Sequence, residues 1–285
     1  MKSRYWLSFL LATFSLDGFA QQKIVEHAIV KAKSEITFPE NANRNAGGGD
    51  DNPFAAGGME TKSTIYFTKD FTKTFTESDF GNNTVIIDKK NERTTTLTQA
   101  NGRKTGFYST AEDEAEMRRR MDSTRQARGQ SGGNRDSASR DVEIINTDQT
   151  KKIAGYTCKK AIIKTKTRQG ENETTVWYTP DFKMAEGYPT GMGAGFGRGG
   201  GGGRQRGGGG FSMNGLEKID GFVMEYEVSR PNGFSMHMEV TSVDLAPALN
   251  DKTFEIPKGY DIKPIKEMQG QFFGVGNANR NTENN

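Results

Sequence analysis

The residue types that most often perform chemistry in proteins are scarce in this chain. Its 285 residues include two histidines, His27 and His237, and one cysteine, Cys158. The histidines fall on separate expected strands and the cysteine has no second cysteine nearby, so the sequence holds neither zinc-ligand spacing nor a hydrolytic triad. We interpret Cys158 as a buried strand residue, with a thiol-dependent role as the alternative. We expect no catalytic residues, no metal site, no cofactor and no enzymatic activity.

A glycine-rich segment at 187–215 contains the one string that matches a cofactor motif. Residues 195–200, Gly-Phe-Gly-Arg-Gly-Gly, fit the dinucleotide-binding fingerprint, but glycine continues on both sides where that motif needs a strand and a helix. The same segment resembles an RNA-binding tail, because arginines alternate with glycines and phenylalanines. We interpret it as a flexible low-complexity insertion and expect no nucleic-acid partner.

Aromatic and methionine side chains on the expected strands are the remaining candidate for function. The plain interpretation is a hydrophobic core. The functional alternative is an apolar groove on a curved, incompletely closed sheet, because methionine adapts to ligands of irregular shape. The candidate groove residues are Trp177, Tyr178, Phe222, Met224, Tyr226, Met236 and Met238.

The first 20 residues predict export. Lys2 and Arg4 precede an apolar run that is too short to span a membrane, and Gly18-Phe19-Ala20 provides a cleavage site. No cysteine lies near this site, so we expect a periplasmic or secreted protein that is not a lipoprotein and has no transmembrane segment after cleavage. Without the leader the net charge is +2, because Lys2, Arg4 and Asp17 leave the total of 39 basic and 36 acidic residues. This near balance disfavours a general polyanion-binding surface.

The composition predicts a mainly β protein with long irregular segments. Only 33% of the residues are hydrophobic and 35 are glycine, so much of the chain cannot join a core. Leucine is rare beyond the leader, whereas threonine and phenylalanine are abundant. We expect one β-rich domain at 21–268, disordered insertions near 41–59, 129–140 and 187–215, and a disordered tail at 269–285.

Periodicity places the strands. Alternation over 24–38 predicts one long amphipathic strand with Ile24 and Val30 on the same face. Between residues 60 and 110, short extended runs separated by polar turns predict an antiparallel meander, with Asn101-Gly102 as its clearest hairpin turn. Its phenylalanines are expected to form one aromatic face (Phe67, Phe71, Phe75, Phe80 and Phe107).

Two further hairpins and one helix complete the expected elements. Residues 151–182 and 221–243 each contain two runs of β-branched and aromatic residues joined by a polar turn. Residues 111–128 begin with acidic side chains and end with arginines, an order that complements the helix dipole. We interpret the arginines as a solvated, internally paired face; the alternative is binding of phosphate or anionic lipid.

Four segments resemble a known family: Ile-Ala-Gly-Tyr-Thr-Cys-Lys-Lys-Ala at 153–161, Val-Trp-Tyr-Thr at 176–179, Gly-Phe-Val-Met-Glu-Tyr at 221–226 and Phe-Glu-Ile-Pro-Lys-Gly-Tyr at 254–260. They are similar to the secreted proteins of domain of unknown function 4412, and the first also resembles the GLPGLI family of Bacteroidota envelope proteins. The resemblance implies a periplasmic or extracellular curved antiparallel sheet with an apolar concave face, comparable with the half-barrel of Lol lipoprotein carriers. We expect one or two short helices beside the sheet. It implies no activity and supplies no catalytic residues.

These observations predict an exported, uncharacterised envelope protein that binds an apolar ligand or an envelope partner through a curved β-sheet, without catalysis. The alternative is a structural or adhesive envelope protein that acts through its glycine-rich loops, with the sheet as a scaffold.

Overall fold

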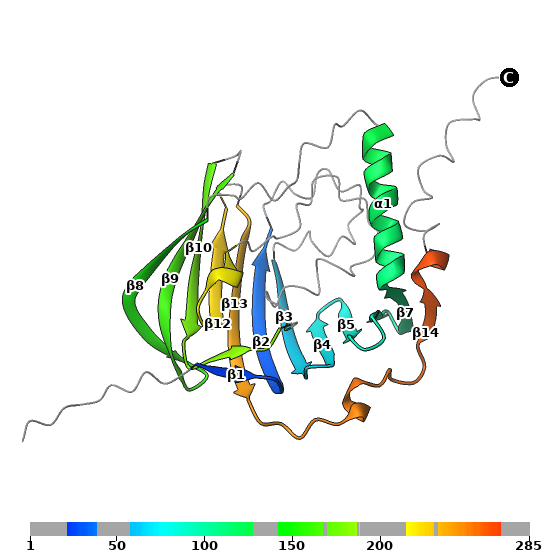
Figure 1. The fold of residues 1–285 in the computed structure, drawn as a ribbon, viewed down its shortest axis with the longest axis horizontal. Coiled ribbons are helices and arrows are strands. Elements are labelled where there is room, and N and C mark those ends of the chain that lie inside the picture. Colours follow the sequence, from blue (N-terminus) through cyan, green and yellow to red (C-terminus); the bar gives the residue numbers. More distant parts are fainter. Residues whose placement is uncertain are drawn as a thin grey trace, which may run out of the picture.

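The computed structural model contains one large sheet and little helix (Figure 1). It describes residues 22–38, 58–127, 142–167, 170–186, 188, 215–230 and 233–268. The expected leader and tail, and nearly all residues of the three expected insertions, lie outside these ranges. Two of the expected insertions reached too far. Met59 is buried in a strand, Tyr188 packs against aromatic rings, and Gly215 is buried beside the 3₁₀ turn η3 (Leu216–Lys218).

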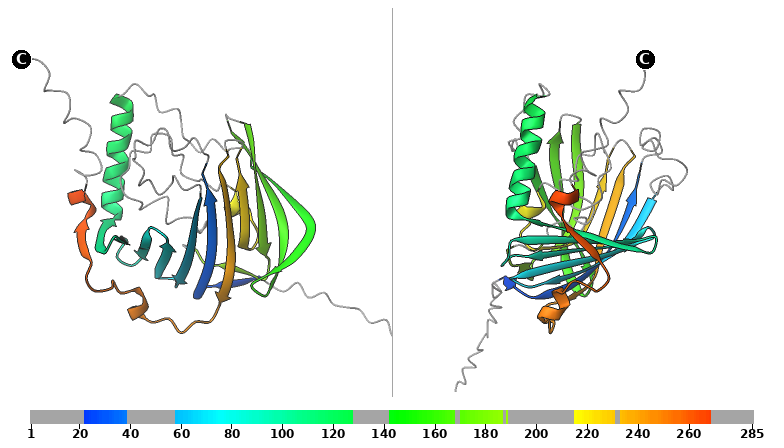
Figure 2. Two further views of the ribbon diagram at one scale, coloured as in Figure 1. Left: turned by 180° about the vertical axis from the view of Figure 1, so that it is seen from behind. Right: turned by 90° about the vertical axis from the view of Figure 1, so that its right-hand side faces the viewer.

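The main sheet has twelve strands and is open. Its neighbours are antiparallel except for the pair of its first two strands, which is parallel. In order across the sheet the strands are β14 (Asp261–Pro264), β7 (Arg103–Thr110), β6 (Arg93–Ala100), β5 (Gly81–Asp88), β4 (Phe71–Ser78), β3 (Gly58–Phe67), β2 (Ala28–Thr37), β13 (Ser235–Asp244), β12 (Phe222–Ser229), β10 (Gly170–Thr179), β9 (Tyr156–Thr167) and β8 (Val142–Ile153). The sheet bends strongly, so that β4 to β7 run crosswise to the β8 to β13 half (Figure 2). These features confirm the expected mainly β, curved antiparallel architecture.

Strand β2 defines the two faces of the sheet. Its even-numbered side chains, such as Val30, are buried, whereas Lys31 and Glu35 on the other side are exposed. We call the face with Val30 the inner face and the opposite one the outer face. Alternation of this kind is what a strand with one covered side requires.

The prediction of a single strand over 24–38 was wrong. A bend at Glu26 and His27 separates β2 from β1 (Lys23–Val25), which pairs in parallel with β11 (Phe182–Met184) in a separate two-stranded sheet. The bend reverses the alternation, so Val25 is buried while Ile24 is 59% exposed. Because the side-chain period is two, a continuous strand would have kept Ile24 on the side of Val30, so the reversal comes from the bend itself.

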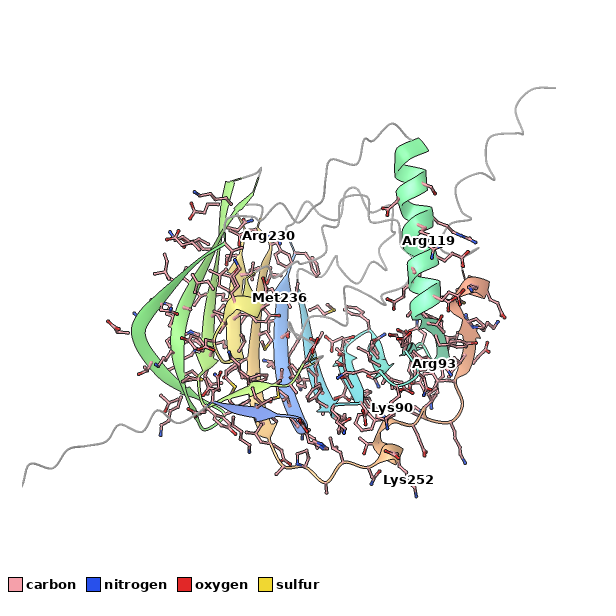
Figure 3. All side chains as sticks on the ribbon, in the orientation of Figure 1. Lys90, Arg93, Arg119, Arg230, Met236 and Lys252 are labelled. Atoms are coloured by element: carbon pink, nitrogen blue, oxygen red, sulfur yellow. The ribbon has the colours of Figure 1, made fainter. Side chains whose placement is uncertain are left out.

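The inner face of the β2, β13, β12, β10 and β9 half carries the main hydrophobic core. The two short strands β1 and β11 and the 3₁₀ turn η3 (Leu216–Lys218) supply its other layer through Val25, Phe182 and Leu216. Met236, labelled in Figure 3, belongs to this core. The covering elements flank the glycine-rich segment, since β11 precedes it and η3 follows it.

The β4 to β6 region is covered on its outer face instead. The 3₁₀ turn η4 (Asp251–Phe254) packs there, with the Phe254 ring stacked on Phe71 at 5.2 Å and the Lys73 ammonium donating to the Thr253 carbonyl at 2.7 Å. The expected single aromatic face of the meander was therefore wrong. The pairing register places Phe67 and Phe107 on the inner face and Phe71 and Phe75 on the outer face, and Phe80 is 43% exposed in a turn.

Turn chemistry agrees with the sequence at the Asn-Gly site. Asn101 and Gly102 join β6 to β7 with φ angles of 51° and 74°, the left-handed values that a type I′ hairpin turn needs. The β8–β9 turn uses Ala154 at φ 46° before Gly155 at φ 89°. Alanine is an unfavourable residue at such a position, because its Cβ crowds the backbone.

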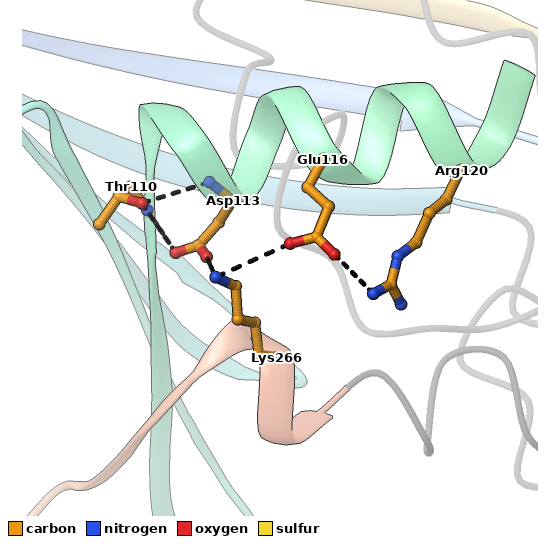
Figure 4. A network of polar contacts seen from close by, with 5 residues as sticks. All are labelled: Thr110, Asp113, Glu116, Arg120 and Lys266. Carbon is orange, nitrogen blue, oxygen red and sulfur yellow. Dashed lines mark hydrogen bonds and ion pairs between the residues drawn. The ribbon is translucent and has the colours of Figure 1, made fainter.

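Helix α1 (Ala111–Ala127) follows β7 directly and extends away from the sheet (Figures 1 and 2). It begins with reciprocal capping: Asp113 N donates to Thr110 Oγ1 at 3.2 Å, and Thr110 N donates to Asp113 Oδ2 at 2.9 Å (Figure 4). Lys266 binds Asp113 Oδ1 at 2.9 Å, so this cap also holds the C-terminal segment that carries β14. Glu116 pairs with Arg120, which agrees with an internally paired helix surface.

Candidate functional site

Five of the seven expected groove residues lie together on the inner face. Phe222, Met224 and Tyr226 come from β12, and Met236 and Met238 come from the neighbouring β13. Each is at most 6% exposed, and Tyr226 Oη contacts Met236 Sδ at 4.0 Å. Their side chains form part of the packed core, so an apolar ligand would reach them only by displacing the layer made by β11 and η3.

The two groove residues on β10 separate from one another. A β-bulge between Trp177 and Tyr178 shifts the register against β12. Tyr178 is buried and belongs to the hydrophobic core. Trp177 packs against this core from the outer face and is only partly buried. The close approach of β10 beside this bulge requires a glycine at position 221, because a Cβ there would lie 2.3 Å from the Thr179 carbonyl oxygen.

Trp177 instead joins a charged cluster on the outer face that sequence reasoning missed. The Lys151 ammonium lies 4.5 Å from the Trp177 ring centroid and 2.5 Å from Glu225 Oε2. His237 Nε2 lies 3.4 Å from the other oxygen of the same carboxylate. These side chains come from β8, β10, β12 and β13, so only the strand order brings them together. Ion pairs and cation–π contacts between partly exposed side chains contribute little to stability, so we assign this cluster a modest structural role.

A row of aromatic rings crosses the inner face from β9 to β3. Tyr156 meets Phe182 at 5.2 Å, Phe182 stacks on Phe222 at 5.1 Å, Phe222 meets Tyr188 at 5.5 Å, and Tyr188 meets Phe67 at 5.2 Å. The five rings come from four strands and the segment after β11, and no periodic pattern links them in the sequence. Their edge-to-face and offset contacts are the favourable geometries for aromatic pairs.

The row ends at a polar corner around Phe67. Thr72 on β4 is the direct cross-strand neighbour of Phe67, and the Lys89 ammonium lies 5.0 Å from the Phe67 ring centroid. Lys89 also donates to the carbonyl oxygens of Lys69 and Glu186, which ties the β5–β6 turn to the segment that carries Tyr188. Burial lowers the pKa of Lys89, although the charges of Asp70 and Glu186 oppose that effect.

Beyond this corner the inner face of β4 to β7 changes character. It presents mainly threonines, with Val85 and Ile87 among them, and both of these apolar side chains are only half-buried. The outer face of the same strands is better covered, since Ile86 is 5% exposed and Leu97 is fully buried. The inner surface of this half therefore carries partly exposed apolar side chains among the described residues.

Cys158 is buried beside the main core. Burial raises the pKa of its thiol to about 11, with smaller opposing effects from the Ile153 backbone and the charge of Lys151. A thiol of this kind is protonated at neutral pH and reacts slowly. Across the residues that the structure describes, no group of three or more histidine, cysteine or acidic side chains could hold a metal ion. No helix in those residues is long and apolar enough to cross a membrane.

The fold defines a β-rich protein built on one open, curved sheet with a buried aromatic row. The chain belongs to the family of the domain of unknown function DUF4412, whose model matches residues 55–260. This match confirms the family that the four sequence segments predicted. No curated protein matches the chain.

Among solved structures, two crystal forms of PNGF-II resemble the chain at 19% sequence identity and a TM-score of 0.35. The similarity covers 86% of this chain and 32% or 33% of that protein, so the chain spans about a third of its length.

Proposed function

We propose that this protein is an exported, non-catalytic binding protein of the cell envelope that holds an apolar ligand or envelope partner on the inner face of its sheet. The leader expected at 1–20 supports export, and the resemblance of residues 153–161 to GLPGLI envelope proteins supports a role in the envelope. The observation that carries the binding role is the contrast between the two halves of the inner face. One half is sealed by β11 and η3, whereas Val85 and Ile87 on the other half remain half-buried.

A surface that continues a hydrophobic core outward is suited to apolar ligands. The aromatic row ends at Phe67, and Ile87 lies one strand beyond Thr72 on the same face. An apolar molecule placed there would bury the exposed parts of Ile87 and Val85 at about 25 cal/mol per Å² of apolar surface. The residues expected to form the groove, such as Met224 and Tyr226, would then support the site from within the core.

The first experiment is native mass spectrometry of the protein purified from its own envelope, followed by organic extraction of any bound molecule. A stoichiometric apolar molecule supports the proposal. Replacing Ile87 with glutamate should abolish its retention, because the new charge would have to be desolvated beneath the ligand. Phe80→Glu is the matched control, since Phe80 is an exposed aromatic in the β4–β5 turn.

Deleting residues 191–210 distinguishes binding by the sheet from the alternative, a structural or adhesive role of the glycine-rich loops. Retained ligand or partner binding by the deleted protein supports the sheet as the binding element. Loss of partner association with an unchanged unfolding midpoint contradicts it and favours a structural or adhesive role for the loops.

A further inference from the structure

Two hydroxyl groups at the Phe67 corner are buried without satisfying their hydrogen-bonding capacity. Thr72 Oγ1 and Tyr188 Oη each lack a hydrogen-bond partner in the described part of the chain. Thr72 is 1% exposed, and Tyr188 packs its ring between Phe67 and Phe222. Native proteins pair nearly all buried polar groups, so two such groups near one ring call for a functional explanation.

The corner brings three groups that can bind an anion to one aromatic ring. Thr72 faces Phe67 across the β3–β4 ladder, where opposed Cβ atoms lie about 5 Å apart. Tyr188 packs edge-on against the same ring at 5.2 Å, and the Lys89 ammonium lies 5.0 Å from its centroid. Burial raises the pKa of Tyr188 above its ordinary value, so its phenol keeps its proton and can donate it to an acceptor.

An apolar path leaves this corner along the inner face. Ile87 is the cross-strand neighbour of Thr72 on β5, and Val85 lies two residues before it on the same face. Both are half-buried. The site therefore combines donors and a positive charge at one end with an aliphatic surface at the other.

We infer that Thr72, Tyr188 and Lys89 bind the carboxylate of a single-chain aliphatic acid whose hydrocarbon chain lies over Ile87 and Val85. This inference rests on the proposed binding function and names its ligand class. A carboxylate accepts hydrogen bonds only, so it matches two hydroxyl donors and an ammonium group. Hydrogen bonds to a charged acceptor are stronger than those between neutral groups, and they would satisfy both buried hydroxyls at once.

The test compares dodecanoate with dodecan-1-ol, titrated calorimetrically into the full mature chain. Thr72→Val and Tyr188→Phe should each weaken dodecanoate binding about tenfold or more, because each removes one hydrogen bond to a charged acceptor. Lys89→Met should weaken dodecanoate binding and leave dodecan-1-ol affinity within about twofold, because only the acid uses the charge. In the absence of dodecanoate, Thr72→Val and Tyr188→Phe should raise the thermal midpoint by about 2–4 °C, since each removes a buried hydroxyl that has no partner among the described residues.

Matched controls keep this result interpretable. Thr84→Val removes an equally buried threonine hydroxyl on the outer face, and Tyr226→Phe removes a buried phenol that already contacts Met236. Neither should change dodecanoate affinity. Wild-type affinity for dodecanoate in Thr72→Val, Tyr188→Phe and Lys89→Met overturns the inference but leaves the proposed function standing. Absence of binding of both dodecanoate and dodecan-1-ol to the wild-type protein overturns the inference, whereas an extracted apolar molecule of another class would still support the proposed function.

Discussion

Replacing Phe182 with alanine should remove the centre of the layer that seals the core. Phe182 is 1% exposed and contacts two aromatic rings, Tyr156 at 5.2 Å and Phe222 at 5.1 Å. Truncating a buried phenylalanine costs about 3–5 kcal/mol, because apolar burial is lost and a cavity remains. We expect the upper part of this range, since both ring pairs vanish and β11, only three residues long, also holds β1. Such a loss is a large fraction of the roughly 5–15 kcal/mol that stabilises a typical domain.

Urea unfolding followed by tryptophan fluorescence measures this loss directly. The sequence has two tryptophans, Trp6 in the expected leader and Trp177, so a protein prepared without residues 1–20 carries a single reporter on the main sheet. Phe80→Ala is the control, because Phe80 is 43% exposed and its truncation should change the free energy of unfolding by less than about 0.5 kcal/mol. A Phe182→Ala protein within about 1 kcal/mol of wild type would refute the view that β11 seals the core.

Three smaller predictions test other features of the fold. Cys158, whose thiol pKa is raised to about 11, should react with Ellman's reagent at pH 8 only after unfolding; prompt stoichiometric reaction of the folded protein would contradict its burial. Hydrogen bonds from Lys266 and then from Thr110 lower the pKa of Asp113, so its stabilising contribution is present at neutral pH and is lost as the pH falls below the ordinary carboxyl range; Lys266→Met should reduce this acid sensitivity of the urea midpoint, and an unchanged pH profile would argue against the pair. Ala154→Asn should raise the free energy of unfolding by about 0.5–1 kcal/mol, because asparagine tolerates the left-handed conformation; a lower urea midpoint would show that the turn is not strained.

Local chemistry made much of the β architecture predictable. The strands of the meander, the 221–243 hairpin and the helix lie within a few residues of their expected positions, because turn residues and alternation are local signals. The first arm of the 151–182 hairpin was wrong at its start, because a turn at Ala154-Gly155 separates β8 from β9. Asn101-Gly102 adopts the conformation that its sequence predicts. The break at Glu26 and His27 was missed, since neither residue is a turn former and the alternation on each side looked continuous.

The positions of the site residues depended on strand order, which is a long-range property. Alternation indicates that Trp177 and Val176 face opposite sides, but it does not say which side is covered. The cluster of Trp177 with Lys151 and Glu225 needs β8, β10 and β12 in one order, with a bulge at Trp177/Tyr178. The sequence does not mark Tyr188 as a site residue, because it lies beside a low-complexity segment. Its place in the site is defined by its ring contacts with Phe67 and Phe222.

The change of covered face between β3 and β4 explains why the candidate site lies where it does. On β3 the core side chains, ending with Phe67, point to the inner face beneath the layer that includes Tyr188. Four residues later Phe71 packs on the outer face against Phe254, so the inward positions of β4 no longer need to be apolar. Thr72 is the first of these inward positions; it is 1% exposed, and its hydroxyl has no hydrogen-bond partner in the described part of the chain. A polar group at the boundary between a sealed and a half-exposed apolar surface is where an amphiphilic ligand can satisfy both kinds of contact.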